Sequence, residues 1–132
     1  MEETIFSKII RGDIPCYKVA ENDQFFAFLD INPLAKGHTL VVPKKVTDYI
    51  FDIDDEKLGQ MICFAKKVAK AIKDNYDCSK IGMTVIGLEV PHAHIHLVPI
   101  NGVNDIDFRK PKLNFTEEEF KEIAFNISQS IR

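Results

Sequence analysis

The 132-residue sequence predicts an α+β domain built on a five-stranded antiparallel sheet with two helices. Five short runs are rich in β-branched and aromatic residues, and adjacent runs are joined by hairpin-length links. Two longer segments carry apolar residues at helical spacing. A chain of this length can bury one core without disulfides or metals. We therefore expect one domain over residues 1–132, with 101–132 a C-terminal extension that ends in a helix.

The first half of the chain is dominated by predicted strands. An apolar run at 5–10 is followed by a turn signal at 11–15, Arg-Gly-Asp-Ile-Pro. A hairpin loop at 21–23 separates the next two β-rich runs, and a loop at 32–37 precedes the third. The predicted strands of this half are 17–20, 24–31 and 38–43.

The second half combines the two predicted helices with the last two strands. The first helix should run from about 54 to 74, with Asp52 and Asp54 as candidate N-caps. A capping box at 116–119 predicts the start of the second helix. Strands are expected at 80–87 and 92–100. The apolar stripe expected to be buried in the first helix is Leu58, Met61, Ile62, Ala65, Val68, Ala69 and Ile72, and Phe64 and Ala71 add apolar surface beyond it.

The charge and cysteine content exclude several classes of protein. The formal net charge is -3 and no block of Lys or Arg stands out, which argues against nucleic acid or membrane surfaces as partners. The three cysteines form no C-x-x-C pair, so a disulfide framework is not expected. The sequence shows neither a signal peptide nor a run of ~20 apolar residues. We expect a cytoplasmic protein.

Three of the four histidines alternate along one predicted strand, at His92, His94 and His96. Alternate side chains of a strand share a face, roughly 6.5–7 Å apart. The apolar residues between and after these histidines then occupy the opposite face and suit a core. We therefore expect one face of this strand to pack in the core and the other face, with its histidines, to form a functional site.

A row of three imidazoles allows several interpretations. Neutral imidazoles bind metals, protonated ones bind anions, and histidine is a competent nucleophile in phosphoryl transfer. The plainest alternative is three polar side chains without a chemical role. That alternative would require three separate buried partners or a wet surface, so catalysis or anion binding is favoured, and metal binding alone remains open.

The segment His-Ala-His-Ile-His-Leu-Val at 92–98 resembles the H-φ-H-φ-H-φ-φ signature of the histidine triad superfamily, where φ is apolar. Upstream segments resemble that family's blocks in the same order. Because the ordered set is more specific than three histidines, we identify the chain as similar to the nucleotide-binding branch of this superfamily. The upstream segments are 5–9, 12–15, 28–33 and 37–44.

The resemblance implies an activity and an assembly. Members pair into homodimers with a continuous sheet, and they hydrolyse nucleoside monophosphate derivatives, typically of purines, at the α-phosphorus. A nucleotidyl-histidine intermediate forms and water then releases the nucleoside monophosphate. A phosphoramidase-like hydrolase that needs no cofactor is the leading hypothesis. The alternatives are a dinucleoside polyphosphate hydrolase and a nucleotide-binding interaction module with weak catalysis.

The resemblance also implies the roles of individual residues. His94 would be the nucleophile, held by the carbonyl of His92, and His96 would contact the phosphate or the leaving group. His92 and His38 would orient the site, and Asp30 would accept hydrogen bonds from ribose hydroxyls. The expected walls of the base pocket are Ile5, Phe6, Ile9 and Ile31, although plain core packing is the alternative for Ile9 and Ile31.

The sequence departs from the family in two places. Many relatives carry two cysteines and a histidine as zinc ligands where this chain has Thr4, Ser7 and Val46, so structural zinc is not expected. Relatives also have a longer loop rich in Asn and Gly before the histidines, with a Gln at the position of Leu88. Polar phosphate contacts from that loop cannot be carried over, which leaves the leaving group open.

Overall fold

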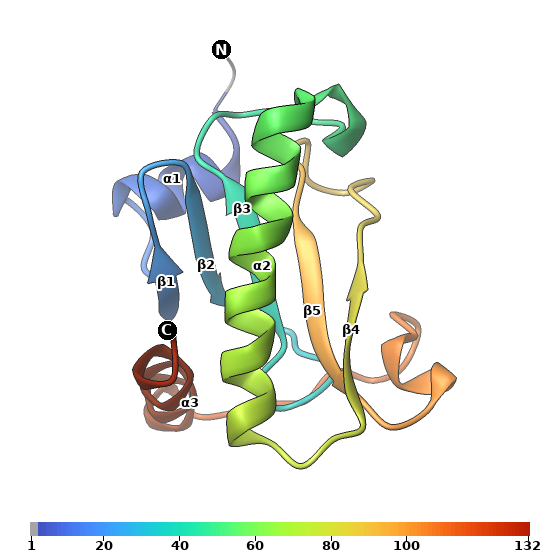
Figure 1. Ribbon diagram of the computed structural model, residues 1–132. Coiled ribbons are helices and arrows are strands. Elements are labelled where there is room, and N and C mark those ends of the chain that lie inside the picture. Colours follow the sequence, from blue (N-terminus) through green and yellow to red (C-terminus); the bar gives the residue numbers. More distant parts are fainter. Residues whose placement is uncertain (1–2) are drawn as a thin grey trace.

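A computed structural model describes residues 3–132. Its centre is an antiparallel five-stranded sheet in the order β1-β2-β3-β5-β4, which confirms the predicted α+β fold (Figure 1). The strand β5 lies between β3 and β4, so the segment that follows the first two histidines is in the sheet interior. The strands are β1 (Lys18–Glu21), β2 (Phe25–Leu29), β3 (Thr39–Pro43), β4 (Lys80–Thr84) and β5 (Ile95–Ile100).

The two faces of the sheet are covered differently. The long helix α2 (Asp55–Asn75) crosses one face, and α3 (Glu117–Gln129) packs beside it against β1 (Figure 1). The main core lies between these helices and the sheet. On the opposite face, the short helix α1 (Ile5–Arg11) inserts Phe6 into a smaller cluster. That cluster comprises Phe6, Phe26, Phe28, Leu40 and Val42.

Helix α1 corrects the prediction of two helices. Thr4 caps it, because its hydroxyl accepts a hydrogen bond from the Ser7 N–H while Ser7 Oγ accepts from the Thr4 N–H. Gly12 ends it with φ of 89°, a left-handed conformation that glycine adopts without a steric penalty. Thr4 and Gly12 were the sequence features that could have indicated this helix, but the apolar run between them is too short to show a helical period.

The strand predicted over 92–100 begins only at Ile95 in the structure. The His92 N–H is bonded to the Val90 carbonyl, and the Ala93 N–H is bonded to the Thr47 carbonyl in the β3–α2 connection. These backbone bonds take the place of a sheet ladder, so two of the three alternating histidines precede the strand. Strands β2 and β4 also end earlier than predicted, at Leu29 and Thr84.

Helix α2 follows its prediction closely and is capped by Asp54, whose side chain accepts from the Lys57 N–H. Asp52, the other candidate cap, lies in the short 3₁₀ helix η1 (Ile50–Asp52). The expected burial of Ile62 was wrong: it is 40% exposed, because the buried face is centred about a third of a turn away around the helix. The buried residues of α2 are Met61, Phe64, Ala65, Val68, Ala71 and Ile72.

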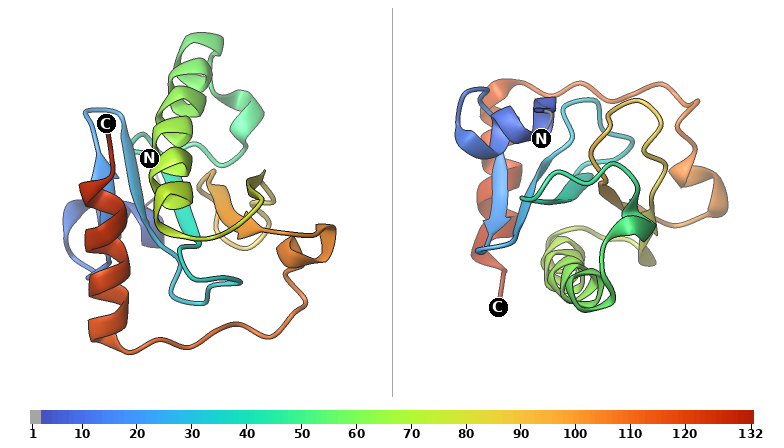
Figure 2. Two further views of the ribbon diagram at one scale, coloured as in Figure 1. Left: turned by 60° about the horizontal axis from the view of Figure 1, so that its bottom comes forward. Right: turned by 90° about the horizontal axis from the view of Figure 1, so that it is seen from above.

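The C-terminal extension crosses the molecule before it forms its helix. After β5 and the 3₁₀ helix η2 (Val103–Ile106), residues 107–116 run without regular structure from the β4 side of the sheet to the β1 side (Figure 2). We call residues 107–116 the crossing segment. Thr116 and Glu119 form the predicted capping box of α3. None of the described helices is long and apolar enough to cross a membrane.

Candidate active site

A cavity of about 590 Å³ opens on the α1 face of the sheet and collects most of the predicted site residues. His94 and His96 line it, whereas His92 and His38 lie behind them and do not. Ile31 at its rim is 63% exposed, which argues against plain core packing for this residue. The other predicted residues in its lining are Asp30, Ile5, Phe6 and Ile9.

The tautomer of His94 follows from its hydrogen bond. Its Nδ1–H donates to the backbone carbonyl of His92 at 2.8 Å, because a carbonyl can only accept. The neutral form of His94 therefore carries its proton on Nδ1 and a lone pair on Nε2. The edge of the Phe6 ring packs against the imidazole with the ring centroids 5.0 Å apart, which restricts its rotation.

His92 is held from both sides and is fully buried. Its Nε2–H donates to the Pro43 carbonyl at 2.7 Å, so its Nδ1 must accept, and the Thr4 hydroxyl donates to it at 2.7 Å. Burial lowers the pKa of His92, which favours this neutral form. The two hydrogen bonds fix the residue whose carbonyl orients His94, and they connect α1 to the end of β3.

His38 and His96 form a second chain of directed hydrogen bonds. The Leu34 N–H donates to His38 Nδ1 at 3.0 Å, so His38 carries its proton on Nε2 and donates it to His96 Nδ1 at 3.0 Å. The proton of neutral His96 is then on Nε2. Burial lowers the pKa of His38 to about 3 and that of His96 to about 4, so both are neutral near pH 7.

Asp30 adjoins this chain at the end of β2. The Asn32 N–H donates to its Oδ1 at 2.8 Å, and its Oδ2 lies 3.5 Å from His38 Nε2. Burial raises the pKa of the Asp30 carboxyl, while the backbone bond from Asn32 and the nearby His94 and Lys112 oppose that shift. Because His38 is neutral and donates its Nε2 proton to His96, this contact is not an ion pair.

The cluster of Asp30, His38 and His96 also has the spacing of metal ligands, with ligand atoms within 4.8 Å of one another. A ligating nitrogen needs a free lone pair, however, and the Leu34 N–H bond leaves the proton of His38 on the nitrogen that faces the other two residues. The arrangement therefore suits a proton-donor chain better than a metal centre. Thr4 and Ser7 occupy the positions at which the sequence predicts no zinc ligands. Their hydroxyl groups hydrogen-bond to one another, and the Thr4 hydroxyl also hydrogen-bonds to His92.

The comparison with known families accords with this geometry. Residues 11–102 match the family model described as the HIT domain, which is more than half of the chain. The chain belongs to the HIT (histidine triad) family. It is 37% identical to the adenosine 5'-monophosphoramidase hnt1 of Schizosaccharomyces pombe, over 97% of this chain and 98% of that protein.

Solved structures of HIT proteins share the whole architecture. A Hit-like protein from Bartonella henselae, described as involved in cell-cycle regulation, superposes with a TM-score of 0.84 at 33% identity over 98% of this chain and 96% of that one. A zinc-bound histidine triad family protein from Mycobacterium smegmatis superposes with a TM-score of 0.78 at 26% identity, covering 95% and 93%. The α+β HIT fold thus extends beyond the matched domain into the C-terminal extension.

The cavity residues that sequence reasoning missed include Phe108 and Lys112, which come from the crossing segment. The Phe108 ring packs edge-on against His96 with centroids 4.7 Å apart. Neither residue belongs to a periodic pattern or a family block, and the HIT match ends at residue 102. The available signal was an aromatic residue followed closely by three basic residues, Arg109, Lys110 and Lys112.

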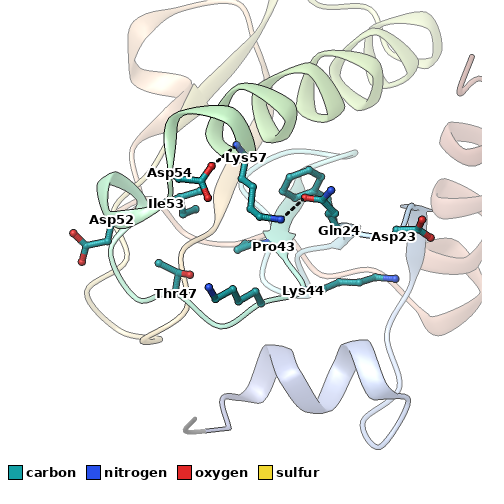
Figure 3. A pocket seen from close by; sticks show the side chains of 11 residues that line it. Asp23, Gln24, Pro43, Lys44, Thr47, Asp52, Ile53, Asp54 and Lys57 are labelled. Atoms are coloured by element: carbon teal, nitrogen blue, oxygen red, sulfur yellow. Dashed lines mark hydrogen bonds between the residues drawn. The ribbon is translucent and has the colours of Figure 1, made fainter.

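A second cleft, of about 320 Å³, lies at the N-terminus of α2 (Figure 3). Lysines and aspartates alternate around it, and the Lys57 ammonium donates to the Gln24 side-chain oxygen at 3.1 Å (Figure 3). The mixed charges offset one another, and none of the four histidines contributes to its lining. This cleft therefore does not provide the chemistry that the histidine cavity does.

Proposed function

We propose that this HIT protein is a nucleoside phosphoramidase-like hydrolase that acts at the α-phosphorus of nucleoside monophosphate derivatives, with His94 as nucleophile. The observation that carries the proposal is the bond from His94 Nδ1–H to the His92 carbonyl, which gives the neutral tautomer its lone pair at Nε2 on a side chain that lines the cavity. A nucleophilic imidazole needs that free lone pair. The name of the fission-yeast relative favours an amine as leaving group over a nucleotide polyphosphate.

In the first step, His94 Nε2 attacks the α-phosphorus while the bond from phosphorus to the leaving amine breaks. The leaving nitrogen takes a proton from Nε2 of His96 in its imidazolium form, which the negative charge of the bound phosphoramidate favours, and His96 becomes a neutral imidazole. A nucleotidyl group is then bound covalently to His94.

In the second step, water attacks the same phosphorus and the bond to His94 Nε2 breaks. His96 Nε2, now unprotonated, accepts the proton of that water. The products are the nucleoside monophosphate and the starting state of both histidines. Splitting one displacement into two in this way lowers the barrier of each.

The remaining lining suits a nucleoside. Ile5, Phe6, Ile9 and Ile31 provide an apolar slot for the base, and the Asp30 carboxylate can accept bonds from both ribose hydroxyls. Asp30→Ala should therefore weaken binding of AMP but not of a dideoxyribose analogue, measured by calorimetry. Equal losses for the two ligands would remove Asp30 from the ribose site.

We also propose that the protein forms a homodimer through β4 and the outer face of α2. The strand β4 is at the edge of the sheet, and unpaired edges invite strand addition. Large apolar side chains are exposed along this side of the molecule: Ile62, Met83, Tyr49 and Phe51. Light scattering at micromolar concentration should give a mass about twice 15.1 kDa, and a monomer mass would contradict this assembly.

The direct test of the activity is incubation with an adenosine phosphoramidate. The wild-type protein should release AMP, and His94→Ala should lose several powers of ten in rate because its nucleophile is gone. Equal rates for the two proteins would refute the proposal. Binding of AMP without hydrolysis by the wild type would favour the alternative of an interaction module.

A further inference from the structure

The crossing segment places a cation in the histidine cavity. Lys112 lines this cavity together with His94 and His96, and its side chain is half-buried. Its ammonium donates to the backbone carbonyls of Phe108 and Lys110, the latter at 3.0 Å. The Leu113 N–H donates to the Pro33 carbonyl at 2.9 Å, which ties the segment to the loop that follows Asp30. The position of this ammonium is therefore built into the fold.

The Lys112 ammonium offsets the negative charge of the other side chains that line the cavity. Among the described residues that line the cavity, Lys112 is the one lysine or arginine, whereas Asp30 and Glu89 are carboxylates. Burial keeps His38 and His96 neutral near pH 7 by lowering the pKa of each. Without Lys112 these side chains would present net negative charge to an anionic nucleotide, and like charges repel.

The ammonium is close enough to affect its neighbours. Its positive charge opposes the rise that burial causes in the pKa of the Asp30 carboxyl, and it adds to the lowering that burial causes in the pKa of His38. Of the three ammonium protons, two are directed to backbone carbonyls, so one remains for a further acceptor. Phe108, four residues earlier, shields the His38–His96 pair, with its ring centroid 6.1 Å from His38. The segment thus contributes both an apolar cover and a cation to one site.

We propose that Lys112 is a substrate-binding residue whose ammonium contacts the phosphate group of the bound nucleotide. The inference rests on the proposed function for the identity of the ligand as a nucleoside monophosphate. It assigns to the C-terminal extension, outside the matched HIT domain, the cationic contact of the cavity. A charge-assisted hydrogen bond of this kind strengthens binding of the anion and leaves binding of the uncharged nucleoside unaffected.

The test compares the affinities of AMP and adenosine by isothermal calorimetry. Lys112→Met should weaken AMP binding about tenfold and change adenosine binding less than about twofold. Lys112→Arg should restore most of the AMP affinity. The matched control is Lys110→Met, since Lys110 is exposed on the same segment, 3.8 Å from Asp105, and its side chain does not line the cavity. This control should bind both ligands as the wild type does.

Two results would overturn the proposal. Equal weakening of AMP and adenosine by Lys112→Met would mean that Lys112 supports the nucleoside pocket and not the phosphate. Unchanged affinity for both ligands would mean that the ammonium has no ligand. Retained adenosine binding reports that the variant is folded, and failure of the wild type itself to bind AMP would refute the proposed function instead.

Discussion

The two faces of the segment 92–97 differ in what holds them. On one face, Ala93, Ile95 and Leu97 are buried in the main core beneath α2 and α3. On the other, three histidines are each fixed by a specific hydrogen bond, and two of them, His94 and His96, line the cavity. Packing on the first face depends on the volume of its side chains, whereas the hydrogen bonds on the second depend on which imidazole nitrogen carries the proton. Substitutions on one face should therefore affect stability, and on the other chemistry.

The largest expected effect is on the histidine face. His96→Gln removes the imidazole that we expect to protonate the leaving group, so kcat should fall about 10²–10⁴-fold, the usual range for a general acid. The fall should shrink with a substrate whose leaving group needs no proton. Steady-state kinetics with two such substrates measures the difference, and equal losses for both would contradict the role of His96 as acid.

Substitutions on the apolar face should lower the stability of the protein and leave its kcat unchanged. Ile95→Ala removes a fully buried side chain, which typically costs about 2–5 kcal/mol of unfolding free energy. Because Ile95 does not reach the cavity, kcat of the folded fraction should stay near that of the wild type. Urea unfolding gives the stability, and Val103→Ala, at a residue 90% exposed, is the control. A stable variant with lost activity would break the distinction between the faces.

The buried histidines also make stability depend on pH. The pKa of His96 is about 4 in the folded protein, against 6.5 as its ordinary value, so between these pH values the unfolded chain binds a proton that the folded one does not. The stability is therefore full above pH 6.5 and is lost as the pH falls towards 4, by up to about 3 kcal/mol. Urea titrations across this range measure the slope. His96→Gln should flatten it, and an unchanged slope would contradict the neutral, buried state.

A smaller effect is expected where helix α1 meets the histidine face. Thr4→Val keeps the shape of the side chain but removes the hydroxyl that donates to His92 Nδ1. Leaving that buried nitrogen without a donor costs about 1–3 kcal/mol, and we expect kcat to fall about tenfold through misplacement of the carbonyl that orients His94. Thr4→Ser should restore kcat. An unchanged kcat in Thr4→Val, or a kcat in Thr4→Ser as low as that in Thr4→Val, would contradict this role of the Thr4 hydroxyl.

Much of the fold was visible in the sequence because periodic patterns report which face is buried. The sheet, α2 and α3 follow from alternation, a helical stripe and a capping box. The short helix α1 was missed because seven residues are too few to show a period. The start of β5 was placed too early because alternation persists through His92 and His94, although the His92 and Ala93 N–H groups bond to loops instead of strands.

The site was predictable as far as its motifs extend along the chain. The predicted pocket residues gather around one cavity, since blocks of the HIT pattern supply them in a fixed order. The bond from His94 to the His92 carbonyl was expected from the family resemblance, but the tautomers of His38 and His92 were not predictable, because their partners are backbone groups, the Leu34 N–H and the Pro43 carbonyl. Phe108 and Lys112 were missed because tertiary structure alone brings the crossing segment to His96.

The central claim is that His94 Nε2 forms a covalent bond to the α-phosphorus. The most direct measurement is mass spectrometry of the protein denatured without acid during turnover of an adenosine phosphoramidate, because a phosphorus–nitrogen bond to histidine is labile in acid. The account predicts an added adenylyl mass on the peptide that contains His94, absent from His94→Ala. An active His94→Ala protein, or an adduct on another residue of the wild type, would contradict it.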